Sequence, residues 1–272
     1  MCEAAQVSRA GYYRFVARQE VDRDVELRDT IQKIAIEIPS YGYRRVCAEL
    51  KRRNQPANHK RVQRIMREDN LLCLRRRAYV RTTDSKHGNK VYPNLAKEMT
   101  PTDTDQLWVA DLTYIRLRFE FVYLAVILDA FSRRVIGWAL GRTLEGELTL
   151  AALRMALSTR HVSPGLVHHS DRGVQYAAIE YIDLLTQHQI LISMSRKGNP
   201  YDNAQAESFM KTLKYEEVYR SDYRDLQETR REIKRFLEQV YNEKRLHSAL
   251  GYLPPAEFER NLVKSKVAEA QA

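Results

Sequence analysis

Three carboxylates occupy positions from which they could hold metal ions. Asp111 lies inside a β-rich run, where burying a charge is costly unless a partner or a metal compensates it. Asp171 closely follows the apolar run 165–169, and the ligands of α/β enzymes gather at the carboxyl ends of strands. Glu207 lies near the start of a segment with helical spacing. An edge strand, a turn and the helix dipole would explain the three residues separately, but together they favour one metal site.

A group of three carboxylates suits phosphoryl transfer with two divalent cations. Two Mg²⁺ ions about 3.5 to 4 Å apart, for which Mn²⁺ could substitute, need shared oxygen ligands to clamp an in-line displacement. One ion would activate a water or a 3′-hydroxyl and the other would stabilise the leaving 3′-oxygen, so no side chain has to act as the nucleophile. We therefore predict that Asp111, Asp171 and Glu207 are the catalytic residues and the ligands of two ions per active site.

Two lysines follow Glu207 along its predicted helix. Lys211 and Lys214 stand at i+4 and i+7, spacings that bring side chains to one helix face. They could hold a DNA phosphate beside the metal ions. A solvated basic face would explain them almost as well, so both readings stay open.

The segments around these residues predict a mixed α/β sheet. Three closely spaced β-rich runs suggest an antiparallel meander. Helical patterns then alternate with two short strands, which implies a mixed sheet covered by helices on both sides. We expect Asp202 or Asn203 to cap the helix that carries Glu207. The expected strands are 108–116, 121–128, 135–140, 165–169 and 190–194, and the expected helices are 148–157, 179–189, 203–214 and 226–240.

The N-terminal region predicts a small, all-helical domain. Apolar residues recur at helical spacing over 22–38, 44–53 and 59–69, and a short polar link joins the last two segments. Two short helices joined by a tight turn are typical of a helix-turn-helix, which lays its second helix in the DNA major groove. Basic residues on that helix and after it favour DNA contact. The predicted DNA-binding residues of this region are Lys60, Arg61, Arg64, Arg67, Arg75, Arg76 and Arg77.

The composition is consistent with a soluble, nucleic-acid-binding protein. The 272 residues are 44% hydrophobic and 29% charged, and the formal net charge of +10 favours polyanionic partners. Three cysteines without CxxC pairing and no apolar run long enough to span a bilayer predict a cytoplasmic protein with no membrane association. The expected domains are a DNA-binding region at 1–80, a linker at 81–106, a catalytic core at 107–225 and a C-terminal helix and tail at 226–272.

Several motifs resemble those of one transposase family. Four of them are similar to the integrase core of insertion-sequence-3 family transposases, two to the N-terminal helical region of that family and two to its C-terminal signature. The resemblance therefore covers almost the whole chain. In chain order the motifs are Ser8–Arg14, Tyr41–Arg45, Trp108–Tyr114, His169–Gly173, Asn199–Asn203, Ala206–Phe209, Tyr241–His247 and Pro254–Phe258.

This resemblance implies a ribonuclease H-like core with a D-D-E triad at Asp111, Asp171 and Glu207, which cuts the ends of an insertion sequence and transfers the 3′ ends. It also implies a bacterial protein from the second reading frame of the element, associated with the nucleoid when bound to DNA. The expected partners are the element ends and target DNA, an upstream-frame transposase product, and further copies of this chain on DNA, because two ends must be paired. We see no leucine zipper in the sequence, which such an upstream product would carry.

Two other functions fit parts of the pattern. A DNA-binding repressor or a catalytically inactive transposase remnant would need only the helix-turn-helix and the basic residues. A ribonuclease or resolvase would use the acidic residues without joining DNA ends. Three acidic residues in matching contexts argue against an inactive remnant, and the ribonuclease or resolvase is the weaker possibility, which products without joined ends would support.

Other polar residues near the motifs have simpler explanations. Asp129 ends the 121–128 strand and is expected to accept hydrogen bonds in a turn. His168 and His169 are adjacent on a strand, so their side chains should face opposite sides; one of them could approach the metal ions, but packed histidines are the favoured interpretation. A C-terminal group could contact DNA or form a helix-end cap on the core: Tyr241, Arg245 and His247.

Overall fold

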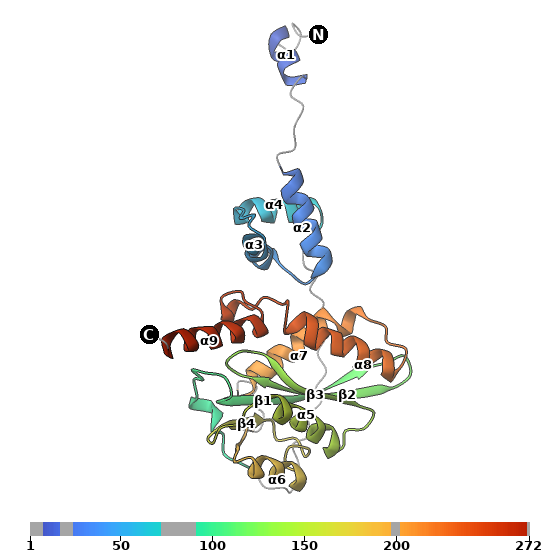
Figure 1. Ribbon diagram of the computed structural model, residues 1–272. Helices are drawn as coiled ribbons and strands as arrows, with labels where there is room; N and C mark the ends of the chain where they lie inside the picture. The colour runs from blue at the N-terminus through green and yellow to red at the C-terminus, as the bar shows by residue number, and fades with distance from the viewer. Residues whose placement is uncertain (1–7, 17–23, 72–90, 197–201, 271–272) are drawn as a thin grey trace. The chain divides into compact units, whose positions relative to one another are not determined.

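The protein is described by a computed structural model that covers residues 8–16, 24–71, 91–196 and 202–270 (Figure 1). The chain divides into two compact units between Arg75 and Arg76. The domain boundaries drawn from the sequence within these units stay predictions. Within the described ranges, no helix is both long and apolar enough to cross a membrane.

In its described residues the N-terminal unit has four helices, and three of them pack around one small core. The buried side chains come from one face of each packed helix, as the spacing predicts: Leu27, Ile31 and Ile34, then Val46 and Leu50, then Val62, Ile65 and Met66. The helices are α1 (Arg9–Val16), α2 (Val25–Glu37), α3 (Tyr43–Arg52) and α4 (His59–Glu68).

Helices α3 and α4 form the predicted helix-turn-helix pair. Asn54 in the link has a φ of 56°, a left-handed conformation that asparagine tolerates in tight turns. Asn58 then begins α4, and its side chain accepts a hydrogen bond of 2.8 Å from the backbone N–H of Lys60. These local signals fix where α3 ends and where the candidate recognition helix begins.

The C-terminal unit is built on a five-stranded mixed sheet with the order β3-β2-β1-β4-β5. The first three strands form the predicted antiparallel meander, and β4 lies parallel to both β1 and β5. This arrangement confirms the predicted α/β class. The strands are β1 (Leu107–Arg116), β2 (Phe121–Asp129), β3 (Val135–Gly141), β4 (Val167–Ser170) and β5 (Leu191–Met194).

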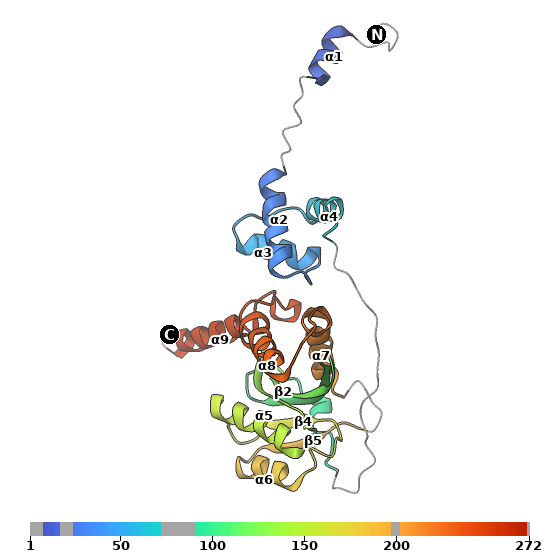
Figure 2. The same cartoon turned by 90° about the vertical axis from the view of Figure 1, so that its right-hand side faces the viewer.

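Helices cover both faces of this sheet (Figure 2). Helices α5 (Gly146–Thr159) and α6 (Ile179–Gln187) enclose one apolar core with the sheet. Helices α7 (Ala204–Glu216) and α8 (Leu226–Arg235) enclose the other, and α8 continues as the π-helical turn η3 (Phe236–Tyr241). Short 3₁₀ turns and a last helix complete the unit: η1 (Ala96–Glu98), η2 (Val218–Arg220), η4 (Ser248–Leu250) and α9 (Pro255–Ala270).

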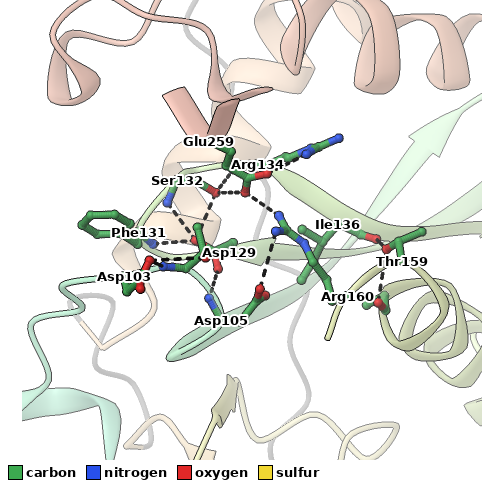
Figure 3. Close-up of polar contacts among 12 residues, drawn as sticks. Asp103, Asp105, Asp129, Phe131, Ser132, Arg134, Ile136, Thr159, Arg160 and Glu259 are labelled. Carbon is green, nitrogen blue, oxygen red and sulfur yellow. Dashed lines mark hydrogen bonds and ion pairs between the residues drawn. The ribbon is translucent and has the colours of Figure 1, made fainter. Parts of the chain in front are cut away.

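A buried polar network fixes the start of α9 to the turn between β2 and β3 (Figure 3). Glu259 of α9 accepts hydrogen bonds from the Ser132 hydroxyl at 2.7 Å and from the Arg134 guanidinium at 2.6 Å. Arg160 also donates to Glu259. Burial by itself would raise the pKa of Glu259, but these three partners together lower it. Asp129 in the same turn accepts three backbone N–H groups, so its predicted structural role is confirmed.

Candidate active site

The strand register brings Asp111 and Asp171 to neighbouring positions. Strands β1 and β4 run parallel, and the last residues paired between them are Val109 and His169. Asp111 follows Val109 by two residues within β1, and Asp171 follows His169 by two residues, directly after the end of β4. Parallel strands keep their register, so the two aspartates leave the paired region at the same level, at the carboxyl end of β4 where the sheet is expected to place a ligand.

Helix α7 begins beside the same part of β1. The side-chain amide of Asn203 donates a hydrogen bond of 3.1 Å to the backbone carbonyl of Ala110, the neighbour of Asp111. The N–H of Glu207 donates to the Asn203 carbonyl at 3.1 Å, so Glu207 lies one helical turn further along. One side chain therefore holds the first turn of α7 against the strand that carries Asp111.

The predicted capping of α7 was wrong in its mechanism. Asn203 is the N-cap residue, but its side chain makes no capping hydrogen bond because it binds β1 instead. Asp202 pairs with Arg196 at 3.1 Å, and the hydrogen bond from this guanidinium lowers the pKa of Asp202 to about 2. A tertiary contact with β1 thus replaces the local cap. The sequence around Asn203 could not predict it, because β1 lies far away in the chain.

The charges of Asp171 and Glu207 act on Asp111. Burial raises the pKa of Asp111 to about 7, and the charges of Asp171 and Glu207 contribute to the rise. The N–H of Leu112, which donates to Asp111 at 2.8 Å, and the charge of Lys214 act in the opposite direction. Glu207 is largely exposed, yet desolvation by the nearby protein also raises its pKa. The site therefore concentrates negative charge.

The carboxylates do not form a ready metal cluster as they stand. In the described part of the chain, no group of three or more His, Cys, Asp and Glu side chains is arranged to hold a metal ion. Two buried atoms near the site also lack hydrogen-bond partners there: the Asn203 side-chain oxygen and the Tyr176 hydroxyl. Burial raises the pKa of Tyr176 well above its usual value, and the charges of Asp171 and Asp111 add to this rise. Sequence analysis had not singled out Tyr176.

Asp171 and the two preceding histidines are held by their own neighbours. The Gly173 N–H donates to Asp171 at 2.9 Å, and a Cβ at position 173 would lie only 3.0 Å from that carboxylate oxygen. His168 contacts the Tyr181 hydroxyl at 2.9 Å, whereas His169 lies 2.8 Å from the Ser193 hydroxyl. Burial lowers the pKa of both histidines, that of His168 to about 3. Both are packed, as predicted.

Lys214 lies beside the carboxylates, whereas Lys211 is solvent-exposed. The Lys214 ammonium is 5.0 Å from the centre of the Tyr114 ring, in a cation–π contact. Burial lowers the pKa of Lys214, and the nearby charge of Asp111 opposes this effect. Lys211 makes no ion pair within the described ranges. A role of either lysine in DNA contact stays a prediction.

Comparisons with known proteins identify the two units. Two family models described as integrase core domain match residues 101–200 and 188–255, and a model described as HTH-like domain matches residues 22–79. The insertion element IS600 uncharacterized 31 kDa protein of Shigella sonnei is 39% identical, over 95% of this chain and 97% of its own length. The transposase InsF for insertion sequence IS3A of Escherichia coli is 32% identical, over 95% of this chain and 92% of its own length. The chain belongs to the insertion-sequence-3 family of transposases.

A third relative is the transposase for insertion sequence element IS904 of Lactococcus lactis, which is 35% identical over 91% of this chain and 98% of its own length. Solved structures are more distant. The catalytic core domain of HTLV-2 integrase in complex with magnesium is 15% identical, with a TM-score of 0.44 over 57% of this chain and 96% of that one. The family match and the mixed sheet confirm the predicted ribonuclease H-like fold of the transposase, and the HTH-like match confirms its helix-turn-helix.

The basic face of the HTH-like domain is partly neutralised by acids of its own unit. Arg61 and Arg64 of α4 both pair with Asp24, and Arg64 also pairs with Glu68 at 2.9 Å. In contrast, the side chains of two other exposed cations of α4 form no ion pair within the described ranges: Lys60 and Arg67. The predicted cations Arg75, Arg76 and Arg77 lie outside the described residues.

The C-terminal group packs against the helix that carries Glu207. Arg245 forms two hydrogen bonds of 2.8 Å with Glu216, the last residue of α7, and both side chains are almost completely buried. The ring of Tyr241 meets Phe209 of α7 edge to face at 4.9 Å. These contacts support the cap interpretation of this group. Sequence analysis had missed Glu216 and Phe209 as its partners, because they follow from tertiary packing.

Proposed function

We propose that this transposase is a D-D-E polynucleotidyl transferase that cleaves and joins the ends of an insertion sequence, with Asp111, Asp171 and Glu207 as its catalytic residues. One observation carries the proposal. Asp111 on β1 and Asp171 directly after β4 stand at matching positions in the register of two parallel strands, Glu207 lies one turn into the adjacent helix, and the charges of Asp171 and Glu207 both act on Asp111. The helix-turn-helix of the other unit supports DNA as the substrate.

The donor set suits divalent cations. Burial raises the pKa of Asp111, the charges of Asp171 and Glu207 add to this rise, and a bound cation would relieve both effects. The orphaned side-chain oxygen of Asn203 offers a further acceptor beside Asp111. We propose that Asp111, Asp171 and Glu207 hold two Mg²⁺ ions, for which Mn²⁺ can substitute. When bound, such ions activate the attacking oxygen and stabilise the leaving 3′-oxygen.

Other residues of the chain position the three carboxylates. Asn203 ties the first turn of α7 to β1, which limits how far Glu207 can move from Asp111. The Gly173 N–H orients the Asp171 carboxylate. Lys214 places a positive charge near Asp111, where it can hold a DNA phosphate while the carboxylates face the reacting atoms.

The partners follow from the reaction. The proposed substrates are the element ends and target DNA, and joining two ends requires at least two copies of the chain on DNA. We also propose that an upstream-frame transposase product takes part, and that the protein acts in the bacterial cytoplasm and at the nucleoid.

A strand-transfer assay with precleaved element ends tests the assignment. Wild-type protein with Mg²⁺ or Mn²⁺ should join the ends to target DNA, whereas Glu207→Gln and Asp111→Asn should each reduce the joining rate by at least about a hundredfold. DNA affinity and folding should be retained. Glu180→Gln is a matched control, because Glu180 is also exposed in the first turn of a helix, α6.

Each alternative has its own result. Joining that survives Glu207→Gln contradicts the triad. Wild-type protein that binds DNA without joining it calls for addition of the upstream-frame product, and continued inactivity then favours a repressor or an inactive remnant. Cleavage without joined products favours a nuclease or resolvase.

A further inference from the structure

Aromatic rings gather on the surface where the β1–β2 hairpin meets the end of α7. Tyr114 and Phe121 of the hairpin meet edge to face, with ring centres 5.6 Å apart. Tyr215 and Tyr219 form a second edge-to-face pair at 5.5 Å. Phe121 is 49% exposed and Tyr219 is 41% exposed, so these two rings present part of their surface to solvent. Large exposed apolar groups in contact with one another are typical of a binding surface.

The two pairs belong to one surface, which we call the aromatic patch: Tyr114, Phe121, Tyr215 and Tyr219. The N–H of Arg118 in the hairpin donates to the Tyr223 carbonyl at 3.3 Å, which fixes the hairpin to the segment after η2. Burial raises the pKa of the Tyr219 hydroxyl, and the nearby hydroxyls of Tyr114 and Tyr215 add to this rise.

The aromatic patch is bordered by cations that form no ion pair within the described ranges. Arg116 lies opposite Phe121 in the strand register, Arg220 follows Tyr219 directly, and the Lys214 ammonium contacts the Tyr114 ring. In the part of the chain that the structure describes, none of these three cations forms an ion pair, and neither does Arg118. Many other arginines of this unit are paired, including Arg134, Arg160 and Arg245.

The patch begins beside the candidate catalytic carboxylates. Lys214 connects the two, because its ammonium contacts the Tyr114 ring and its charge acts on Asp111. A DNA strand whose reacting phosphate lies at the carboxylates would therefore have its next nucleotides within reach of the aromatic rings. Unpaired cations suit the phosphates of that strand, and exposed rings suit the faces of its bases.

Bases inside a duplex cannot use such rings, because they are already stacked on both sides, whereas unpaired bases at a DNA end have free faces. We propose that the aromatic patch binds unstacked nucleobases of the DNA strand that runs from the active site, by stacking on Tyr219 and Phe121 while the neighbouring cations hold its phosphates. The inference rests on the proposed function, since it assigns the strand to that active site. It explains in one step why rings and unpaired cations share this surface.

Binding of two DNA duplexes by the full-length protein tests the proposal. One duplex is blunt and the other carries a five-nucleotide unpaired extension that contains 2-aminopurine, whose fluorescence falls on stacking. Wild-type protein should prefer the extended duplex by about tenfold and quench its fluorescence, because stacking of a single base contributes this much. Tyr219→Ala should remove most of the preference and the quenching, whereas Tyr219→Phe should keep both. Arg220→Gln should weaken binding of both duplexes.

Ile179→Ala is the control for loss of an exposed apolar side chain, because Ile179 is 76% exposed on α6. Equal affinity of wild-type protein for the two duplexes, or a preference that survives Tyr219→Ala, would overturn the proposal. So would a change in oligomeric state of Tyr219→Ala, which would make the patch an interface between copies. Strand transfer that proceeds without any preference for the extension rejects this inference alone, whereas a protein that binds neither duplex contradicts the proposed function as well.

Discussion

Asp111 places an ionisable side chain in the middle of a β-strand, and its surroundings explain how the strand tolerates it. The register between β1 and β4 ends at Val109, and the Ala110 carbonyl accepts a hydrogen bond from Asn203. The Asp111 carboxylate accepts a hydrogen bond from the Leu112 N–H, and the charges of Asp171, Glu207 and Lys214 act on it. Such a residue does little to stabilise the fold, and its position is understandable if it acts on a ligand.

His168 makes the stability of the C-terminal unit sensitive to acid. Its folded pKa of about 3 lies below its ordinary value of 6.5, because burial disfavours the charged ring. Below about pH 6.5 His168 binds a proton in the unfolded chain but not in the folded chain. Stability should therefore be lost as the pH falls from about 6.5 towards 3, by at most about 1.4 kcal/mol per pH unit from this residue.

Tryptophan fluorescence during urea unfolding can measure this effect, because both tryptophans of the chain lie in the C-terminal unit. His168→Gln keeps an acceptor for the Tyr181 hydroxyl but does not titrate, so the difference in unfolding midpoint between pH 7 and pH 5 should shrink. His188→Gln, at an exposed position after α6, should keep the wild-type difference. An unchanged difference in His168→Gln would show that other groups cause the acid sensitivity.

At the scale of elements, α7 depends on the segment that follows α8. Arg245 and Glu216 form a buried, two-bonded ion pair at the end of α7. Arg245→Gln or Glu216→Gln would leave one buried charge without its partner, so each should lower the free energy of unfolding by about 3 kcal/mol. The double variant should lose clearly less than the sum of the two, because the buried charges are then both gone.

Urea unfolding of the four proteins gives the coupling energy directly. The exposed pair of Arg260 and Glu243 at 3.0 Å is the control, and Arg260→Gln should change stability by less than about 1 kcal/mol. If the losses of the Arg245 and Glu216 variants simply add, the pair does not anchor α7. The single variants should also join DNA ends more slowly at unchanged DNA affinity, since α7 carries Glu207.

Elements with strong periodicity could be predicted from the sequence, and those set by distant partners could not. Apolar spacing predicted helices α2 to α4 and the strands of the sheet within a few residues. Helix α9 was expected only as part of a C-terminal helix and tail, because its attachment depends on Glu259 and a turn far away in the chain. The π-helical turn η3 and the side-chain contact of Asn203 follow from tertiary packing in the same way.

At the scale of the whole molecule, the candidate site also combines features that could be predicted locally with contacts that depend on distant parts of the chain. The residue types and positions of Asp111, Asp171 and Glu207 were visible in the sequence, because a strand, a strand end and a helix start each have a local signature. The sequence also indicated Asn203 as a cap and Lys214 as a neighbour of the metal ions, but not their contacts, since Asn203 binds β1 and Lys214 contacts Tyr114 across elements. Sequence therefore indicated which groups could react, and the structure added what positions them.

The two units together should give a DNA affinity that falls as salt rises. The formal net charge is +10, and each lysine or arginine that contacts a phosphate releases counterions, which adds about 0.9 to the slope of log affinity against log salt. Lys60 and Arg67 have no ion pair in the described part of the chain, whereas Arg61 is held by Asp24. Lys60→Gln and Arg67→Gln should therefore each reduce the slope by about 0.9, and Arg61→Gln by less.

Fluorescence anisotropy with a labelled duplex, measured over a series of salt concentrations, gives these slopes. Tyr13→Phe, at an exposed position on α1, keeps the charge of the N-terminal unit and should leave the slope unchanged. An equal loss in Arg61→Gln would mean that DNA displaces Asp24 from this arginine, so that the ion pair orders the side chain without keeping it from the phosphates. A DNA affinity of the wild-type protein that does not change with salt would rule out phosphate contacts by α4. Binding would then have to come from the C-terminal unit, through contacts that do not depend on charge.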